Sequence, residues 1–322
     1  MNNLEEKIFK ANEGNFLQIA LEVFQFQYEN CQVYRNFVSL LNQPYPKSLE
    51  EIPFLPIDFF KTHDVISKNE RSKLVFLSSG TTNQNRSKHY IVKAEMYERS
   101  FLQTYIDFAG NIENQVILAL LPNYVEQQNS SLVYMVDYLI KQTKSELSGF
   151  YKDDFPILIA NYQKAISKGK KVVIFGVSYA LLDLAELKPN LSQALIIETG
   201  GMKGRRKELL KSELHNILKK AFQTNSISSE YGMTELLSQT YSDKDEFFSL
   251  PSWMKVLIRD TNDPFTYVSS TKTGGINVID LANLYSCSFI ATQDLGQVSE
   301  RGLKLMGRFD NADIRGCNLM VE

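Results

Sequence analysis

Hydroxyl side chains, a glycine and basic residues follow a short apolar run near residue 77. The run Leu74-Val75-Phe76-Leu77 has the length of a strand, and segment 78–88 continues it as Ser-Ser-Gly-Thr-Thr-Asn-Gln-Asn-Arg-Ser-Lys. Backbone N–H groups, hydroxyls and a lysine in a turn after a strand are suited to binding phosphate oxygens. An ordinary polar turn between two strands has the same composition, so this segment alone leaves both interpretations open.

Two further segments place glycines, an aromatic ring and carboxylates after strand-like runs. In segment 198–207, which begins Glu-Thr-Gly-Gly-Met-Lys, the paired glycines allow close approach of a flat or phosphorylated ligand at the start of a helix. In segment 228–235, Ser-Ser-Glu-Tyr-Gly-Met-Thr-Glu, Tyr231 can stack on a base and Glu235 offers oxygen ligands to Mg²⁺. The alternatives are a tight turn before a solvated helix and a carboxylate in the first turn of a helix.

Two segments near the end of the chain carry further polar groups. Asp294 follows a strand-like run in Thr292-Gln293-Asp294, and its carboxylate can accept hydrogen bonds from the hydroxyls of a ribose. Segment 307–317 is charged and bounded by glycines, and it ends at Cys317. A routine turn and a solvated terminal segment are the respective alternatives.

Apolar periodicity indicates the elements that position these segments. Residues 1–43 have apolar side chains mostly at spacings of three and four, which predicts helices, and Pro44 and Pro46 end the pattern. From about residue 71, strand-length apolar runs alternate with amphipathic stretches, which predicts an α/β architecture with much parallel sheet. The predicted strands there are 73–77, 116–121, 172–175, 194–198 and 227–229, and the predicted helices are 94–108, 130–148, 156–168, 178–187 and 204–223. After residue 240, strand-like segments 253–259, 275–280 and 285–291 predict a smaller, mostly β part.

The composition argues against several classes of function. The chain has 322 residues, of which 43% are hydrophobic and 22% charged, and a net charge of −2, so we expect neither a nucleic-acid partner nor binding to an anionic membrane. We expect no secretory signal at the amino terminus and no membrane span, because no apolar run approaches the roughly 20 residues that a membrane helix needs. Three cysteines are too few for a disulfide framework, which favours a cytoplasmic location.

The order of the five segments resembles the core motifs of the adenylate-forming (acyl-CoA synthetase-like) superfamily. The motifs are Ser-Ser-Gly-Thr-Thr…Lys, Gly-Gly, Tyr-Gly-Met-Thr-Glu, Thr-Gln-Asp and Gly-Arg-Phe-Asp-Asn…Arg-Gly, and the resemblance covers residues 50–317. The proline-flanked segment 52–56 with Phe59-Phe60-Lys61 is similar to the phenylacetate-CoA ligase branch. The short length and segment 198–206 look most like the acyl-protein synthetase branch, the LuxE family of bacterial fatty-acid reductase complexes.

The resemblance implies a fold: the large N-terminal domain of an adenylate-forming enzyme. This domain has parallel-rich sheets flanked by helices and a smaller β-rich subdomain. We therefore expect an adenylation core over 1–306, made of a helical region 1–70, an α/β core 71–240 and a mostly β subdomain 241–306. Residues 307–322 would be a remnant of the hinge motif and a tail, with the C-terminal lid domain absent.

The resemblance also implies roles for individual residues. The ATP phosphates would be bound by Ser78, Ser79, Gly80, Thr81, Thr82 and Lys88. Gly200 and Gly201 would line the cleft for adenine and acyl-adenylate, and Tyr231 would pack on the adenine. Thr234 would contact the α-phosphate and Glu235 would hold Mg²⁺. Asp294 would bind the ribose hydroxyls, and Arg308 would reach ribose or phosphate.

Three departures from the superfamily pattern matter. Asn83 stands where a glycine usually continues the phosphate loop, and Gln293 replaces the glycine before the ribose-binding Asp. The chain also ends just past the hinge motif, so the lid lysine that stabilises charge on the phosphoryl centre is expected to be missing. Lys203 or Arg205, beside the paired glycines, is the expected source of a replacement charge.

The function implied is ATP-dependent activation of a carboxylic acid, expected to be a fatty acid, as an acyl-adenylate. The acyl group would then pass to a thiol, with Cys317 as the candidate and with Arg308 and Arg315 close enough in sequence to lower its pKa. An acyl-accepting protein, such as a reductase or an acyl carrier protein, would be the final partner. Two alternatives stay open: a ligase that loads CoA or a carrier protein with Cys317 incidental, and a non-catalytic module that binds an adenylate or acyl group.

Overall fold

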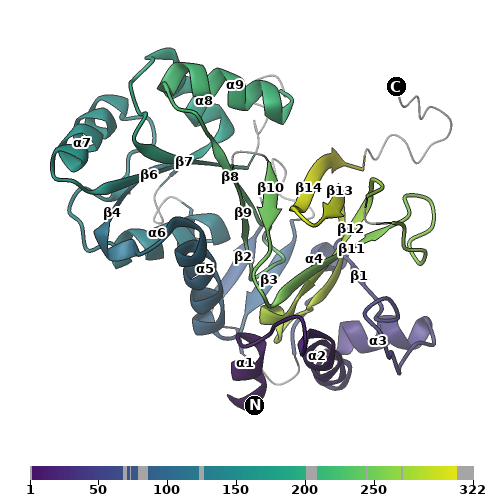
Figure 1. The fold of residues 1–322 in the computed structure, drawn as a ribbon. Coiled ribbons are helices and arrows are strands. Elements are labelled where there is room, and N and C mark those ends of the chain that lie inside the picture. Colours follow the sequence, from purple (N-terminus) through teal and green to yellow (C-terminus); the bar gives the residue numbers. More distant parts are fainter. Residues whose placement is uncertain are drawn as a thin grey trace. The chain divides into compact units, whose positions relative to one another are not determined.

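A computed structural model describes residues 2–67, 71–72, 74–78, 86–122, 127–200, 209–243, 246–269 and 271–309 of the chain (Figure 1). The protein divides into two compact units. The first combines residues 1–71 with 249–322, and the second is formed by residues 72–248. The two ends of the chain therefore build one unit, and the middle of the chain builds the other.

The helical region of the first unit contains α1 (Asn2–Ile8), α2 (Phe16–Asn30), α3 (Gln32–Leu40) and the short α4 (Phe59–Thr62). These helices form because their apolar side chains recur at spacings of three and four. In α2, Phe16, Ile19, Ala20, Val23, Phe24 and Gln27 are buried. The helical pattern predicted for residues 1–43 is thus present, divided among three helices.

The sheet of the first unit is antiparallel over β11 (Met254–Arg259), β12 (Gly274–Asp280), β13 (Phe289–Ser299) and β14 (Gly302–Arg308). The two-residue strand β1 (Leu55–Pro56) pairs parallel with β13. A predicted strand over 285–291 begins only at Phe289. The preceding residues form a turn instead, because the buried amide of Gln27 binds the backbone oxygens of Asn283 and Leu284.

The second unit contains a parallel sheet with one antiparallel edge. Its strands are β4 (Gln115–Leu120), β5 (Gly149–Phe150), β6 (Lys171–Val177), β7 (Ala194–Thr199) and β8 (Ser228–Tyr231), in the order β8-β7-β6-β4-β5. The strand β9 (Thr240–Ser242) runs antiparallel to β8, and β10 (Phe247–Ser249) lies beside β9. All six residues of β4 are buried, as expected for a strand of a parallel sheet that is covered on both faces.

The helices that the structure describes in the second unit flank this sheet (Figure 1). They are α5 (Ala94–Ala109), α6 (Ser131–Gln142), α7 (Phe155–Ser167), α8 (Ser178–Glu186) and α9 (Lys211–Phe222). The helix predicted over 130–148 ends early at Gln142. The hydroxyl of Thr143 donates to the oxygen of Ile140, and Lys144 adopts a positive φ of 51°, which a continuing helix does not allow.

A separate hairpin precedes α5. It consists of β2 (Leu74–Leu77) and β3 (Lys88–Ile91), which pair antiparallel with Leu77 opposite Lys88. The polar segment predicted to bind phosphates connects these two strands. Residues 79–85 of that connection lie outside the described part of the chain.

Candidate functional site

The candidate site in the second unit is built at the carboxyl ends of β6, β7 and β8. These strands are parallel neighbours, with Val177 opposite Thr199 and Glu198 opposite Ser229, so their ends lie on the same edge of the sheet. Ligands of open α/β sheets bind at this edge. Gly200 directly follows β7, and the predicted segment 231–235 begins at the last residue of β8.

Gly200 allows the chain to turn as it leaves β7. Its φ is +69°, a left-handed conformation that glycine adopts without strain. The hydroxyl oxygen of Ser178, at the start of α8, lies 3.1 Å from the backbone oxygen of Gly200. The predicted residues Gly201 and Lys203 follow at once but lie outside the described residues.

Glu198 is a buried carboxylate that anchors the end of β7. Ser178 donates to its Oε1 over 2.5 Å and Ser229 donates to its Oε2 over 3.0 Å, and His215 Nε2 lies 3.9 Å from Oε2. Burial alone would raise the pKa of this carboxyl, but His215, Lys211 and the two serines outweigh it and hold the pKa below its usual value. Glu198 therefore stays ionised and ties together α8, α9, β7 and β8.

Glu230 is a second carboxylate, one residue further along the neighbouring strand. Thr199 donates a hydrogen bond of 2.5 Å to its Oε2, and a Cβ atom on Gly232 would lie only 2.5 Å from its Oε1. Burial raises the pKa of Glu230 to about 7, the negative charge of Glu198 adds to the rise, and Thr199 and Lys211 oppose it. The pKa values of these two carboxyls, on adjacent strands, are thus shifted in opposite directions.

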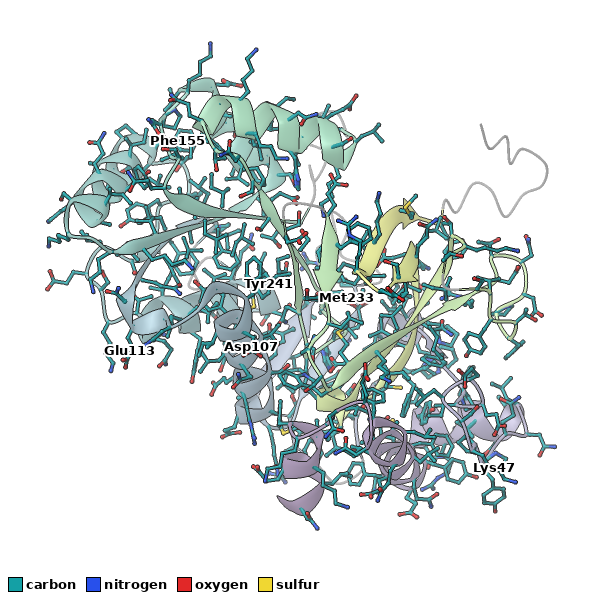
Figure 2. All side chains as sticks on the ribbon, in the orientation of Figure 1. Lys47, Asp107, Glu113, Phe155, Met233 and Tyr241 are labelled. Carbon is teal, nitrogen blue, oxygen red and sulfur yellow. The ribbon has the colours of Figure 1, made fainter. Side chains whose placement is uncertain are left out.

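The segment 231–235 combines an aromatic ring with polar groups. The ring of Tyr231 packs edge-on against Phe248, with ring centroids 5.9 Å apart, and Lys211 Nζ lies 4.5 Å from the centroid of the same Phe248 ring. Glu235 is buried and Thr234 is half-buried. Figure 2 labels Met233 in the middle of this segment.

The hairpin β2–β3 contacts segment 231–235 through His89. This buried side chain of β3 donates from Nδ1 to the backbone oxygen of Thr234 over 2.7 Å. At the base of the hairpin, Ser78 N donates to Ser87 O and Ser87 N donates to Ser78 Oγ. Ser78 and the exposed Lys88 therefore lie at the base of a connection whose other predicted members, Ser79, Gly80, Thr81 and Thr82, are outside the described residues.

Sequence reasoning missed His89. Only a weak signal could have found it, because a polar residue stands at an inward-facing position of a short alternating strand. Its bond to Thr234 joins positions 145 residues apart, and only the fold reveals it.

The first unit brings together Asp294, predicted to bind the ribose hydroxyls, and Arg308, predicted to reach ribose or phosphate. Asp294 on β13 lies directly opposite Arg308 on β14, and Arg308 Nε is 3.0 Å from Asp294 Oδ1. The Arg308 side chain is 70% exposed, so this ion pair adds at most about 1 kcal/mol to stability. The ion pair orients the two side chains on neighbouring strands.

Gln293, which departs from the superfamily pattern, has structural contacts of its own. Its Nε2 donates to Asp58 Oδ2 over 2.7 Å, and its backbone oxygen accepts from Phe309 N over 2.9 Å. The glutamine thus fixes the segments on either side of Asp294. The predicted acceptor Cys317 lies outside the described residues, and the two described cysteines, Cys31 and Cys287, are buried.

No group of three or more His, Cys, Asp or Glu side chains among the described residues is arranged to hold a metal ion. None of the helices that the structure describes is long and apolar enough to cross a bilayer.

Comparison with solved structures identifies the fold as that of adenylate-forming ligases. A 2-hydroxyisobutyryl-CoA ligase in complex with 2-HIB-AMP and CoA matches with a TM-score of 0.68 and 13% identity over 93% of this chain and 69% of that chain. A long-chain-fatty-acid-CoA ligase, FadD1 from Archaeoglobus fulgidus, matches with a TM-score of 0.53 and 14% identity over 76% and 52%. Apo MatB from Rhodopseudomonas palustris gives 0.52 and 16% over 74% and 48%. The predicted α/β fold is confirmed.

The chain spans about half the length of several of these matches, including an ATP-bound RpMatB-BxBclM chimera, of which it covers 49%. A comparison with curated proteins gives no match. A family model described as "Acyl-protein synthetase, LuxE" matches residues 3–322. The chain therefore belongs to the acyl-protein synthetase (LuxE) family.

Proposed function

We propose that this enzyme activates a carboxylic acid with ATP and then transfers the acyl group to a thiol. The observation that carries the proposal is the junction at the sheet edge, where His89 of the hairpin binds segment 231–235 beside the end of β7. Membership of the LuxE family supports the same chemistry. In the first step a carboxylate oxygen would attack the α-phosphorus of ATP, the bond to pyrophosphate would break, and an acyl-adenylate would form.

The chain's own residues would orient this step. The hydroxyls and backbone of 78–82, together with Lys88, would hold the β- and γ-phosphates, and Thr234 would contact the α-phosphate. Glu235 suits one ligand position of Mg²⁺, because its carboxylate supplies hard oxygen atoms and phosphate oxygens would complete the set. When bound, the ion would neutralise charge on the phosphates.

The resemblance assigns the nucleotide's other parts to further residues. Tyr231 and the glycines 200 and 201 would line the adenine, and Asp294 with Arg308 would bind the ribose. Lys203, at the start of the segment after the glycines, would supply positive charge to the transferring phosphoryl centre.

In the second step a thiolate would attack the carbonyl carbon of the adenylate, and AMP would leave with the bonding electron pair. We propose Cys317 as this thiol, with an acyl-accepting partner protein as the final destination. Cys317 is favoured because Cys31 and Cys287 are buried and burial raises the pKa of each of these two thiols. A fatty acid is the substrate class that the family resemblance favours.

The test is ATP–pyrophosphate exchange across carboxylic acids of graded chain length, followed by hydroxylamine-labile acyl labelling of the protein. Cys317→Ala should keep the exchange and lose the labelling, whereas the control Cys31→Ala should keep both. Thioester formation on added CoA or carrier protein, with labelling retained in Cys317→Ala, would instead select the ligase in which Cys317 is incidental. Binding of nucleotide without exchange for any acid would contradict the proposed activity.

A further inference from the structure

Asp294, the residue proposed for the ribose hydroxyls, lies in a wide bulge of β13. At this point β12 contributes one residue, Ile276, where β13 contributes three, Thr292, Gln293 and Asp294. The regular pairs that flank the bulge are Gly275 with Leu295 and Asn277 with Ala291. A bulge re-aims the side chains of a strand and takes backbone groups out of the regular ladder of hydrogen bonds. The position of Asp294 therefore depends on what holds the bulge in place.

A buried arginine from β11 binds a backbone oxygen on each side of this bulge. Arg259 Nη1 donates to Ile276 O over 2.9 Å, and Arg259 Nη2 donates to Thr292 O over 2.5 Å. Nη1 also donates to Asn277 Oδ1 over 2.7 Å. The planar guanidinium holds its donors in a fixed arrangement, so it joins β12 to β13 at the point where their register shifts.

Gly275 gives the Arg259 side chain its path across β12. The two residues are direct partners in the antiparallel pair of β11 and β12 (Figure 1). A Cβ atom on Gly275 would lie 2.5 Å from Arg259 Cζ and 2.8 Å from Arg259 Nε, closer than real atoms approach. Residue 275 must therefore lack a side chain for the guanidinium to reach β13 in this geometry.

Hydrogen bonds within the bulge connect Arg259 to Asp294. Thr292, whose backbone oxygen binds Arg259, donates from its hydroxyl to Ile276 O over 2.9 Å, and its Oγ1 accepts from Asp294 N over 3.1 Å. Burial lowers the pKa of the Arg259 guanidinium, and Tyr267 and Asp294 act against this lowering. Arg259 is thus linked to Asp294 through the backbone and through charge.

Arg259 is a firmer support for Asp294 than Arg308 is. The Arg308 side chain is 70% exposed, and an exposed ion pair holds its partners only weakly. Arg259 is 8% exposed, and its guanidinium lies 5.3 Å from the centroid of the Phe309 ring. Charged side chains are seldom buried to this extent, because the loss of water around a charge is costly. The hydrogen bonds to the bulge offset this cost and restrict where the guanidinium can lie.

We propose that Arg259 is a positioning residue for the ribose of ATP. It holds the bulge 292–294 so that the Asp294 carboxylate can accept hydrogen bonds from the 2′- and 3′-hydroxyls. Without the guanidinium the bulge relaxes, and a small displacement of the carboxylate weakens both hydrogen bonds. The enzyme then discriminates less between ATP and its deoxy analogues. This inference rests on the proposed function, which assigns Asp294 to the ribose.

The experiment compares ATP, 2′-deoxyATP and 3′-deoxyATP in ATP–pyrophosphate exchange with a saturating carboxylic acid. Wild type should have the highest kcat/KM with ATP, because a group that binds a hydroxyl is left unpaired when the hydroxyl is missing. Asp294→Ala should bring the three values close together. Equal values for the three nucleotides in wild type would contradict the ribose assignment and with it this inference. Exchange with no acid and no nucleotide would contradict the proposed adenylation itself.

Arg259→Lys tests the geometry of the guanidinium while it keeps the charge. A lysine ammonium is a compact point charge and cannot bridge Ile276 O and Thr292 O as the planar fork does. The preference for ATP over 2′-deoxyATP should fall about fivefold or more, through a higher KM for ATP, with little change for the deoxy analogue. The matched control is Arg301→Lys, at an exposed residue of the turn between β13 and β14, and it should keep the wild-type preference.

Gly275→Ala displaces the guanidinium and leaves Arg259 itself unchanged. The added methyl group would occupy the path of the arginine side chain, so this variant should lower the same preference. Thermal unfolding of each variant shows whether it is folded, and Gly275→Ala answers the question where Arg259→Lys does not fold. The inference is overturned if the folded variants keep the wild-type preference for ATP while Asp294→Ala loses it. Arg259 would then stabilise the sheet without positioning the ribose.

Discussion

At the scale of single residues, the site depends on how two carboxylates are ionised. Glu198 accepts hydrogen bonds from two serines and lies near His215 and Lys211, which favours its charged form. Glu230 has one donor, Thr199, and shares its surroundings with the charge of Glu198. The surroundings thus lower the pKa of Glu198 and raise the pKa of Glu230 to about 7.

The raised pKa of Glu230 makes stability depend on pH. Its pKa is about 7 in the folded protein and 4.5 ordinarily, so the folded state holds a proton that the unfolded state releases between these values. The resulting stabilisation is fully present below pH 4.5 and is lost as the pH rises through 7. It amounts to about 3 kcal/mol at 1.36 kcal/mol per pKa unit. The glutamine in Glu230→Gln cannot titrate, so this variant should not lose that stabilisation. Between pH 4.5 and 7 the free energy of unfolding of wild type should therefore fall by about 3 kcal/mol relative to that of Glu230→Gln.

Urea unfolding of both proteins across this pH range provides the measurement. The opposite carboxylate serves as a control. The pKa of Glu198 is lowered, so its stabilisation is present above the ordinary value and is lost as the pH falls below it. Glu198→Gln should therefore be most destabilised at neutral pH. A pH-independent difference between wild type and Glu230→Gln would show that Glu230 is not held with a raised pKa.

At the scale of elements, apolar periodicity predicted most helices and strands of the second unit within a few residues, because each is a continuous buried run or an amphipathic stretch. The motifs likewise led to Gly200, Tyr231, Thr234 and Glu235 at one sheet edge. The packing around Glu230 was not predictable. Gln239 and Tyr241 read as ordinary strand residues, and their partners Tyr97 and Glu230 are identified only by pairing of β8 with β9 and packing of α5.

The contact between the hairpin and segment 231–235 should be required for adenylation. His89→Leu removes the donor to Thr234 O, and His89→Asn restores an N–H close to the Nδ1 position. We expect His89→Leu to lower kcat for ATP–pyrophosphate exchange about tenfold or more, because small displacements of orienting groups are costly. His89→Asn should recover part of the loss. Equal kcat values in wild type and both variants would show that the contact is not required for adenylation. Unfolding measurements on the same proteins would then show how much the contact stabilises the fold.

At the scale of the whole molecule, the first unit depends on segments from both ends of the chain. Gln27 of α2 donates from Nε2 to Asn283 O, Leu284 O and Ser288 Oγ, and its Oε1 accepts from Ser288 N. These partners are more than 250 residues away in the sequence. No local pattern predicts such a pairing, because a glutamine among the apolar positions of a helix looks like an interruption of its buried face.

Removing the Gln27 side chain should therefore destabilise the protein strongly. Gln27→Ala leaves several buried donors and acceptors without a partner, so the free energy of unfolding should fall by at least about 3 kcal/mol. Gln25→Ala, on the same helix, removes an exposed side chain that pairs only with Glu29 and should change it by less than about 0.5 kcal/mol. Chemical denaturation of both variants is the measurement. Similar losses in the two would show that the Gln27 network adds little.

Gly200 has a consequence for which sequences this position accepts. Among the described residues, a methyl group there would meet Val177 Cγ1 at an ordinary distance of 3.7 Å, so their packing does not exclude a side chain. Handedness does, because the φ of +69° suits L-residues poorly. In a randomised library the position should consequently accept glycine first, then asparagine and aspartate, and reject β-branched residues. The left-handed backbone conformation at residue 200 therefore limits which L-amino acids this position of the candidate site accepts.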